Sequence, residues 1–132
     1  MSITGLNHYN LRAPRQLLDE LRHFYVAVVG LMSGPRPPLK TFGYWLYAGN
    51  QDVLHLTQAA ADENRSKNVV STMDHVAFTC TDLLAAKERL QKHNVAYTID
   101  EVPLTGEQQL FFSDPAGNGV ELSCRRNIAT SN

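Results

Sequence analysis

The sequence lacks an excess of charge of either sign, a long apolar run and a cluster of cysteines. Its 132 residues carry 12 Lys and Arg against 13 Asp and Glu, a formal net charge of −1. No broad positive field is available to hold a phosphate backbone, which argues against a nucleic-acid-binding protein. Because 43% of the residues are hydrophobic, the chain also differs from disordered proteins. The composition indicates one small globular domain, or two very small modules that share a core.

Targeting segments and paired cysteines are equally scarce. The first ten residues (MSITGLNHYN) have neither a basic region nor an apolar core, so we expect no secretory signal. The apolar stretch at 24–32 is far shorter than the ~18 residues that cross a bilayer. Cys80 and Cys124 have no nearby Cys or His partner, and each ends an apolar strand-like run. We therefore expect two buried free thiols in a cytoplasmic protein.

Apolar periodicity and turn signals divide the chain into two similar halves, each reading as a strand, a helix and two or three further strands. In the first half we expect a strand at 5–12, a helix from Pro14 to Gly30, a stiff loop at 34–38 and hairpin strands at 42–47 and 53–58. In the second half we expect strands at 74–80, 95–102, 108–113 and 120–124, and a helix that is capped by Thr81 or Asp82 and ends near Asn94.

The repeat predicts an α+β fold of two modules. The first module is expected at 1–58, a linker at 59–72, the second module at 73–126 and a disordered tail at 127–132. A small sheet with one helix has one covered face and one bare face, and a bare apolar-lined face is unstable alone. Pairing two such modules would let their bare faces enclose a cavity.

Four polar residues lie at strand positions that alternate with apolar neighbours, and so point away from the helix-packed face. His8 and His75 are 67 positions apart (75 − 8), and His55 and Glu121 are 66 apart (121 − 55), close to half of the 132 residues. A lone strand His is more often structural, but a mid-strand Glu between Val and Leu needs a cation or hydrogen bonds. Three imidazoles and a carboxylate at repeat-matched positions favour a site for Fe(II), Mn, Ni or Zn.

Further side chains share the parity of this site or flank it. Arg12 would suit a substrate carboxylate, although a strand-end Arg is more often simply exposed. Arg36, in the proline-rich loop, would reach over the cavity. The residues expected to contact substrate are Asn10, Arg12, Trp45, Tyr47, Thr79 and Phe111.

Several motifs resemble those of the vicinal oxygen chelate superfamily, which includes glyoxalase I, extradiol dioxygenases, fosfomycin-resistance thiol transferases, methylmalonyl-CoA epimerase and bleomycin-binding proteins. The matching segments are Leu6-Asn-His8, Asp74-His75-Val-Ala-Phe and, most specifically, Asp114-Pro-Ala-Gly-Asn-Gly-Val-Glu121-Leu. The resemblance covers residues 3–124. It implies two βαβββ modules that form a curved mixed sheet around a metal-containing cavity, with His8, His75 and Glu121 as metal ligands.

The residue on the fourth strand separates the subfamilies. Glyoxalase I places a Glu ligand there and the epimerase a Gln, whereas this sequence has His55. In extradiol dioxygenases the equivalent His is typically an acid/base beside Fe(II). The resemblance therefore slightly favours a dioxygenase-like pattern with Fe(II), in which His55 is an acid/base or a fourth ligand.

We accordingly expect a metal-dependent enzyme that acts on a small substrate with vicinal oxygens. A glyoxalase-like lyase or isomerase, or a thiol transferase, remains an alternative reaction. A non-catalytic drug- or metabolite-binding protein of the bleomycin-resistance kind is the alternative class. By analogy with the family we expect a homodimer, with ligands from one chain or two and no nucleic-acid or membrane partner.

Overall fold

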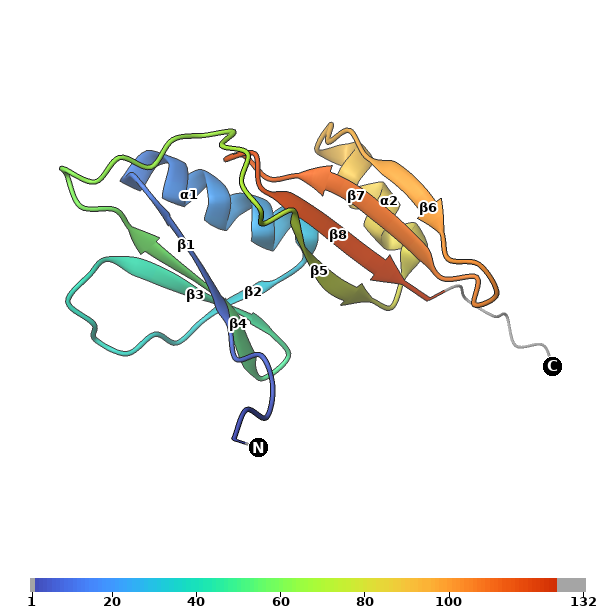
Figure 1. The fold of residues 1–132 in the computed structure, drawn as a ribbon, viewed down its shortest axis with the longest axis horizontal. Coiled ribbons are helices and arrows are strands. Elements are labelled where there is room, and N and C mark those ends of the chain that lie inside the picture. The colour runs from blue at the N-terminus through green and yellow to red at the C-terminus, as the bar shows by residue number, and fades with distance from the viewer. Residues whose placement is uncertain (1, 126–132) are drawn as a thin grey trace. The chain divides into compact units, whose positions relative to one another are not determined.

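The computed structural model describes residues 2–125, and the chain divides between Ser66 and Lys67 into two compact units. Each unit is a four-stranded mixed sheet accompanied by one helical segment (Figure 1). The predicted α+β class and the repeated βαβββ order are therefore confirmed. The division falls inside the segment 59–72 that the sequence marks as a linker, and the expected tail at 127–132 lies outside the described residues.

The first unit has the sheet order β1-β4-β3-β2, with β1 and β4 parallel and the other pairs antiparallel. Its elements are β1 (Tyr9–Ala13), α1 (Arg15–Phe24), a π-helical turn η1 (Tyr25–Val29), β2 (Met32–Gly34), β3 (Gly43–Ala48) and β4 (Gln51–Gln58).

Helix α1 forms because its apolar residues recur on one side and Pro14 precedes its first turn. It lies against β1, β3 and β4 and buries Leu17, Leu18, Leu21 and Phe24. The N–H groups of Gly30 and Leu31 both donate to the Tyr25 carbonyl, at 3.0 and 2.9 Å, which widens the last turn. The segment ends at Gly30 because its φ of 102° suits a residue without a Cβ.

The second unit has the order β5-β8-β7-β6, with β5 and β8 parallel. Its elements are β5 (His75–Cys80), α2 (Leu83–Lys92), β6 (Thr98–Glu101), β7 (Gln108–Ser113) and β8 (Gly119–Cys124). Asp82 caps α2 by accepting a hydrogen bond from the Ala85 N–H at 3.0 Å. The helix buries Ala86 and Leu90.

The turn between β7 and β8 explains the Asp-Pro-Ala-Gly-Asn-Gly motif. Oδ1 of the buried Asp114 accepts hydrogen bonds from the N–H groups of Ala116 and Asn118, both at 2.9 Å. Oδ2 accepts a third, from the Asn118 side chain at 3.0 Å. Gly117 has a φ of 91°, which favours glycine. This tight turn fixes where β8 begins and so where its glutamate lies.

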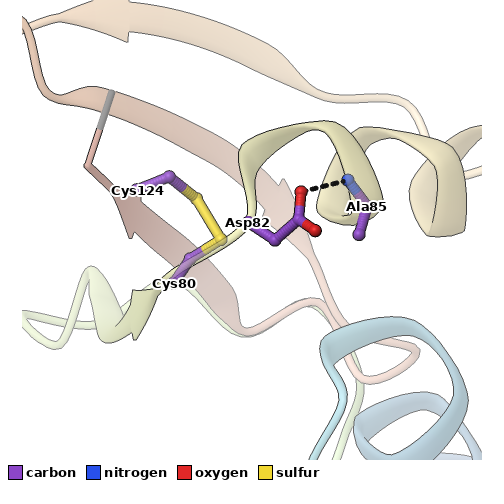
Figure 2. The surroundings of a disulfide bond; sticks show 4 residues. All are labelled: Cys80, Asp82, Ala85 and Cys124. Carbon is purple, nitrogen blue, oxygen red and sulfur yellow. Dashed lines mark hydrogen bonds between the residues drawn. A yellow bond between two sulfur atoms is a disulfide. The ribbon is translucent and has the colours of Figure 1, made fainter. Parts of the chain in front are cut away.

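The expectation of free thiols is wrong, because Cys80 and Cys124 form a disulfide (Figure 2). The two residues are direct register partners at the ends of the parallel strands β5 and β8, with a Cα–Cα distance of 4.4 Å. That separation lies within the range that a disulfide spans. Only Cys124 is fully buried, whereas Cys80 is partly exposed.

Several element boundaries also differ from prediction. The strand expected from residue 5 begins at Tyr9, and the strand expected at 95–102 covers only Thr98–Glu101. Strand β2 was not predicted, because three residues carry too little periodicity to be recognised. Within residues 2–125, no helix has the length and apolar character needed to cross a membrane.

Candidate functional site

His55 is held on the face of the first sheet opposite α1. It lies on β4 between Leu54 and Leu56, both of which are fully buried, and strand alternation turns its side chain the other way. We call this surface the His55 face and define it by the side chains that the strand pairings place on it: Asn10, Arg12, Trp45, His55 and Thr57. His55 and Thr57 are themselves buried.

Three rings stack across the His55 face. Trp45 and His55 are register partners, and their ring centroids lie 4.1 Å apart with an interplanar angle of 6°. The ring of His8, which lies just before β1 rather than within it, stacks on His55 with centroids 3.6 Å apart. Two of the four predicted residues, His8 and His55, are therefore brought together, and the ring of Trp45 also stacks on that of His55.

The nitrogen atoms of both imidazoles have defined partners. The Asp52 carboxylate accepts a hydrogen bond from Nε2 of His55 at 2.6 Å, and this bond is the main reason why the pKa of Asp52 is lowered. The Asn7 side-chain oxygen accepts from Nδ1 of His8 at 2.7 Å. When each imidazole is neutral, these bonds leave the lone pair on Nδ1 of His55 and on Nε2 of His8.

Two of the expected substrate-contacting residues are bound to neighbouring protein groups. Arg12 donates two hydrogen bonds to Glu63, from Nε at 2.8 Å and from Nη2 at 2.6 Å. Glu63 also binds Arg65, and the two guanidinium groups hold the pKa of its carboxyl well below the usual range. Asn10 donates to the Thr57 hydroxyl at 2.8 Å. Arg12 therefore already has a carboxylate partner, which is Glu63.

Tyr47 lies on the same strand as Trp45 and donates from its hydroxyl to the Pro35 carbonyl at 2.5 Å. This bond ties the end of β2 to β3.

In the second unit the other two predicted residues, His75 and Glu121, lie within hydrogen-bonding distance of each other. Glu121 lies mid-strand on β8 and its side chain is only 8% exposed. Its Oε1 lies 3.0 Å from Nε2 of His75, and its Oε2 accepts a hydrogen bond from Gln109 at 3.2 Å. The Asp74 carboxylate accepts from Nδ1 of His75 at 2.8 Å. The bond to Asp74, followed by the charge of Glu121, raises the pKa of His75.

This pair fits a divalent metal. Two donors that each lie ~2.1 Å from one ion at ~90° are ~3.0 Å from each other, which matches the separation of Nε2 of His75 and Oε1 of Glu121, 3.0 Å. Metal-binding histidines usually donate their second ring N–H to a carboxylate or carbonyl. Asp74 plays that part for His75, and the Asn7 side chain does so for His8.

The sequence reasoning did not single out four of these partners: Asn7, Asp52, Asp74 and Gln109. Asn7 and Asp74 had a readable signal, since each directly precedes a candidate ligand and they are 67 positions apart (74 − 7). Asp52 and Gln109 had none, because their contacts depend on the local path of β4 and on the register of β7 with β8.

The remaining expected substrate contacts lie in the second unit. Phe111 meets the ring of His75 edge-on, with centroids 5.6 Å apart. Thr79 is exposed on β5, on the same side as His75.

Neither unit by itself, over residues 2–125, gathers three His, Cys, Asp or Glu side chains into a metal-binding group. Each unit holds one pair, His8 with His55 and His75 with Glu121.

Two βαβββ units in one chain match the architecture that the resemblance to the vicinal oxygen chelate superfamily implies. A family model for the Glyoxalase/Bleomycin resistance protein/Dioxygenase superfamily matches residues 5–122. The chain belongs to this superfamily. No curated protein matches the chain significantly.

Solved structures of the same fold cover nearly the whole chain. A glyoxalase family protein from Bacillus anthracis is 24% identical, with a TM-score of 0.71 and coverage of 96% of this chain and 98% of that one. A lactoylglutathione lyase from Agrobacterium tumefaciens is 21% identical, with a TM-score of 0.64 and coverage of 98% and 100%. TnmS3, an antibiotic binding protein from Streptomyces sp. CB03234, is 22% identical, with a TM-score of 0.65 and coverage of 96% and 99%. These likenesses show the fold.

Proposed function

We propose that this protein is a metal-dependent enzyme acting on a small substrate with two adjacent oxygen atoms. His8, His75 and Glu121 would hold a divalent transition metal, with Fe(II) favoured and Mn, Ni or Zn as alternatives. The observation that carries the proposal is the 3.0 Å approach of His75 Nε2 to the buried Glu121 carboxylate, with Asp74 bound to the opposite ring nitrogen. The proposal requires that the two ligand pairs meet, within one chain or between the chains of a homodimer.

A metal ion in this site would supply Lewis acidity to an enediol or catechol oxygen of the substrate. The residues around it would orient the ligands. Asp74 and Asn7 fix the ring orientations of His75 and His8, and Gln109 holds the outer oxygen of Glu121. Each ligand is thereby set before substrate arrives, which reduces the reorganisation that catalysis requires.

His55 would move the substrate proton. Asp52 accepts its Nε2–H, so Nδ1 carries the lone pair that receives a proton, and Trp45 and His8 hold the ring from both sides. A carboxylate that orients an imidazole in this way is a recurrent arrangement for a general base. Asp52 is then a positioning residue, and a dioxygenase-like reaction is slightly favoured over a glyoxalase-like one.

A second candidate is a protein that sequesters a drug or metabolite without changing it. The ring stack of Trp45, His55 and His8 favours this candidate, because a row of aromatic faces and edges is a good surface for a flat ligand. The antibiotic-binding protein TnmS3 has the same fold.

A substrate screen separates these functions. Catechols, 2-oxoaldehyde–thiol adducts and fosfomycin are incubated with protein loaded with Fe(II), Mn or Ni. We expect turnover of one class, with kcat reduced about 10²–10⁴-fold in His55→Ala and unchanged in His93→Ala, which alters the C-cap residue of α2. Asp52→Asn should lower kcat more than KM. Binding without turnover under every metal would contradict the enzyme and support the sequestering protein.

A further inference from the structure

The disulfide of the second unit has a counterpart in the first unit that is not covalent. Cys80 comes 67 positions after Ala13 (80 − 13), and Cys124 comes 66 positions after Gln58 (124 − 58). Ala13 and Gln58 are register partners at the ends of β1 and β4, as Cys80 and Cys124 are at the ends of β5 and β8. One unit therefore makes this strand pairing without a disulfide, so the fold itself does not require the bond.

In the first unit, packing and a backbone hydrogen bond hold this end of the edge strand β1. Ala13 is only 1% exposed, and its carbonyl accepts a hydrogen bond from the N–H of Ala59 at 2.8 Å. Helix α1 lies against β1 and buries Leu17, Leu18, Leu21 and Phe24. These contacts keep β1 on β4 with no covalent link.

The corresponding edge strand of the second unit has less packing to hold it. Within residues 2–125, β5 pairs only with β8, and each residue of β5 is exposed or partly exposed. Helix α2 buries the smaller set Ala86 and Leu90. Two exposed residues, Thr81 and Asp82, follow Cys80, and Figure 2 shows the disulfide directly before the first turn of α2. The bond to β8 is therefore a strong constraint on this end of β5.

The two sulfur-bearing residues differ in their access to solvent. Cys124 is fully buried, whereas Cys80 is partly exposed at the end of its strand. Exposed disulfides are reduced more easily than buried ones, and they are commonly the regulatory ones. A thiol in solution therefore meets the disulfide at Cys80, and Cys124 is the leaving group.

We propose that Cys80 and Cys124 form a thiol–disulfide switch, and that reduction releases the end of β5 from β8. The thiolate of a small thiol such as glutathione attacks Sγ of Cys80 and forms a mixed disulfide. The Cys80–Cys124 bond breaks, and Cys124 leaves as a thiolate that takes up a proton. A second glutathione thiolate attacks the glutathione sulfur of the mixed disulfide, so that Cys80 leaves and is protonated. Two electrons pass from two glutathione molecules, which leave as one molecule of oxidised glutathione.

The switch acts on the strand that carries His75. In the disulfide form β5 is fixed on β8, the strand that carries Glu121. In the dithiol form β5 is held only by its backbone ladder and by its partly exposed side chains. The inference goes beyond the proposed function and does not rest on it, because it concerns only whether β5 stays on β8.

Amide hydrogen exchange of the full-length protein as purified tests the switch, with free thiols counted by maleimide labelling and intact mass. The protein is equilibrated in glutathione buffers that range from oxidising to the redox poise of the cytosol. We expect both cysteines to become labelled over this range. The amides of β5 that are protected in the oxidised protein should exchange about tenfold faster or more in the reduced protein. The amides of β1 are the internal control and should exchange equally in both states.

The variant Cys80→Ser/Cys124→Ser should exchange at the rate of reduced wild type in every buffer. Comparing wild type in its two states keeps the test independent of whether that variant folds. A disulfide that stays intact at the cytosolic poise would overturn the inference, and so would reduction that leaves the exchange of β5 unchanged. Equal acceleration of β5 and β1 would also overturn it, because the whole fold would then open rather than one strand. Since exchange requires neither metal nor substrate, none of these outcomes depends on the proposed function.

Discussion

Glu63 binds two guanidinium groups at once, and this makes the first unit sensitive to acid. The hydrogen bonds from Arg12 and then Arg65 lower the pKa of the Glu63 carboxyl in the folded protein. Such a group stabilises the fold above its unfolded pKa of ~4.3 and loses that effect as pH falls toward the folded value. We expect Glu63→Gln to lower the Tm at pH 7, and the difference from wild type to shrink as pH falls below about 4. Thermal unfolding across this range measures it, and a pH-independent difference would contradict the account.

Position 43 has no room for a side chain, because a Cβ there would meet both the backbone of β4 and the guanidinium group of Arg36. A Cβ there would lie 2.1 Å from the Leu56 carbonyl oxygen, which belongs to the backbone of β4 and cannot move alone. We expect Gly43→Ala to destabilise the protein by about 2 kcal/mol or more in urea unfolding. Gly5→Ala is the control, since nothing lies within 4 Å of its Cβ. Equal stabilities of the two variants would refute this packing.

Alternation along strands was enough to predict the sheet face of His55 and of Glu121. His55 and Glu121 each lie between buried apolar neighbours, so only one face remains for the polar side chain. Their hydrogen-bond partners, Asp52 and Gln109, could not be predicted in this way, because strand alternation does not indicate which side chains meet. Arg12 was likewise expected to contact substrate because of its position on the strand. Its carboxylate partner is Glu63, which lies 51 positions away in the sequence and could not be predicted from that position.

At the scale of elements, the disulfide ties β5 to β8, the two strands that hold His75 and Glu121. It closes a loop over 44 positions that includes α2, β6 and β7. By chain entropy a loop of this size stabilises a fold by roughly 4 kcal/mol. We expect dithiothreitol to lower the urea midpoint of wild type and to leave that of Cys80→Ser/Cys124→Ser unchanged. A wild-type midpoint that is insensitive to reductant would contradict a structural role for the bond.

Elements with their own periodicity were predicted well. Strand β7 has the predicted bounds, and α1 lies within the helix predicted from Pro14 to Gly30, because its apolar residues recur on one face. Strand β2 could not be predicted, since its three residues become a strand only by pairing with β3. The disulfide was missed for the same reason, because the register of β5 with β8 is not visible in the sequence. The expected cytoplasmic location stays a prediction. Disulfides are rare in the cytosol, so formation of this bond in cells would argue against that location.

At the scale of the whole molecule, the repeat distributes the candidate ligands. The pairs Asn7-His8 and Asp74-His75 are 67 positions apart, and in each pair the first residue binds Nδ1 of the histidine. Half the chain length was readable as a period, and it predicted the repeated fold. The substrate was not readable, because no motif in the sequence names one.

The oligomeric state of the chain follows from the way in which units of this class pair. We expect a homodimer, because units of this class pair either within a chain or between chains. Light scattering at micromolar concentration should give twice the mass of the 14.7 kDa chain. A monomer mass over the accessible concentration range would exclude the dimer and require the two ligand pairs to meet within one chain.

Metal binding by His8, His75 and Glu121 is tested most directly by the metal content of purified full-length protein after loading and desalting. We expect wild type to retain one divalent transition metal for each set of His8, His75 and Glu121. His75→Ala and Glu121→Gln should lose it, Asp74→Asn should bind about 10–100-fold more weakly, and His93→Ala should match wild type. A wild type that retains no metal, or a His75→Ala variant that retains as much as wild type, would contradict the account.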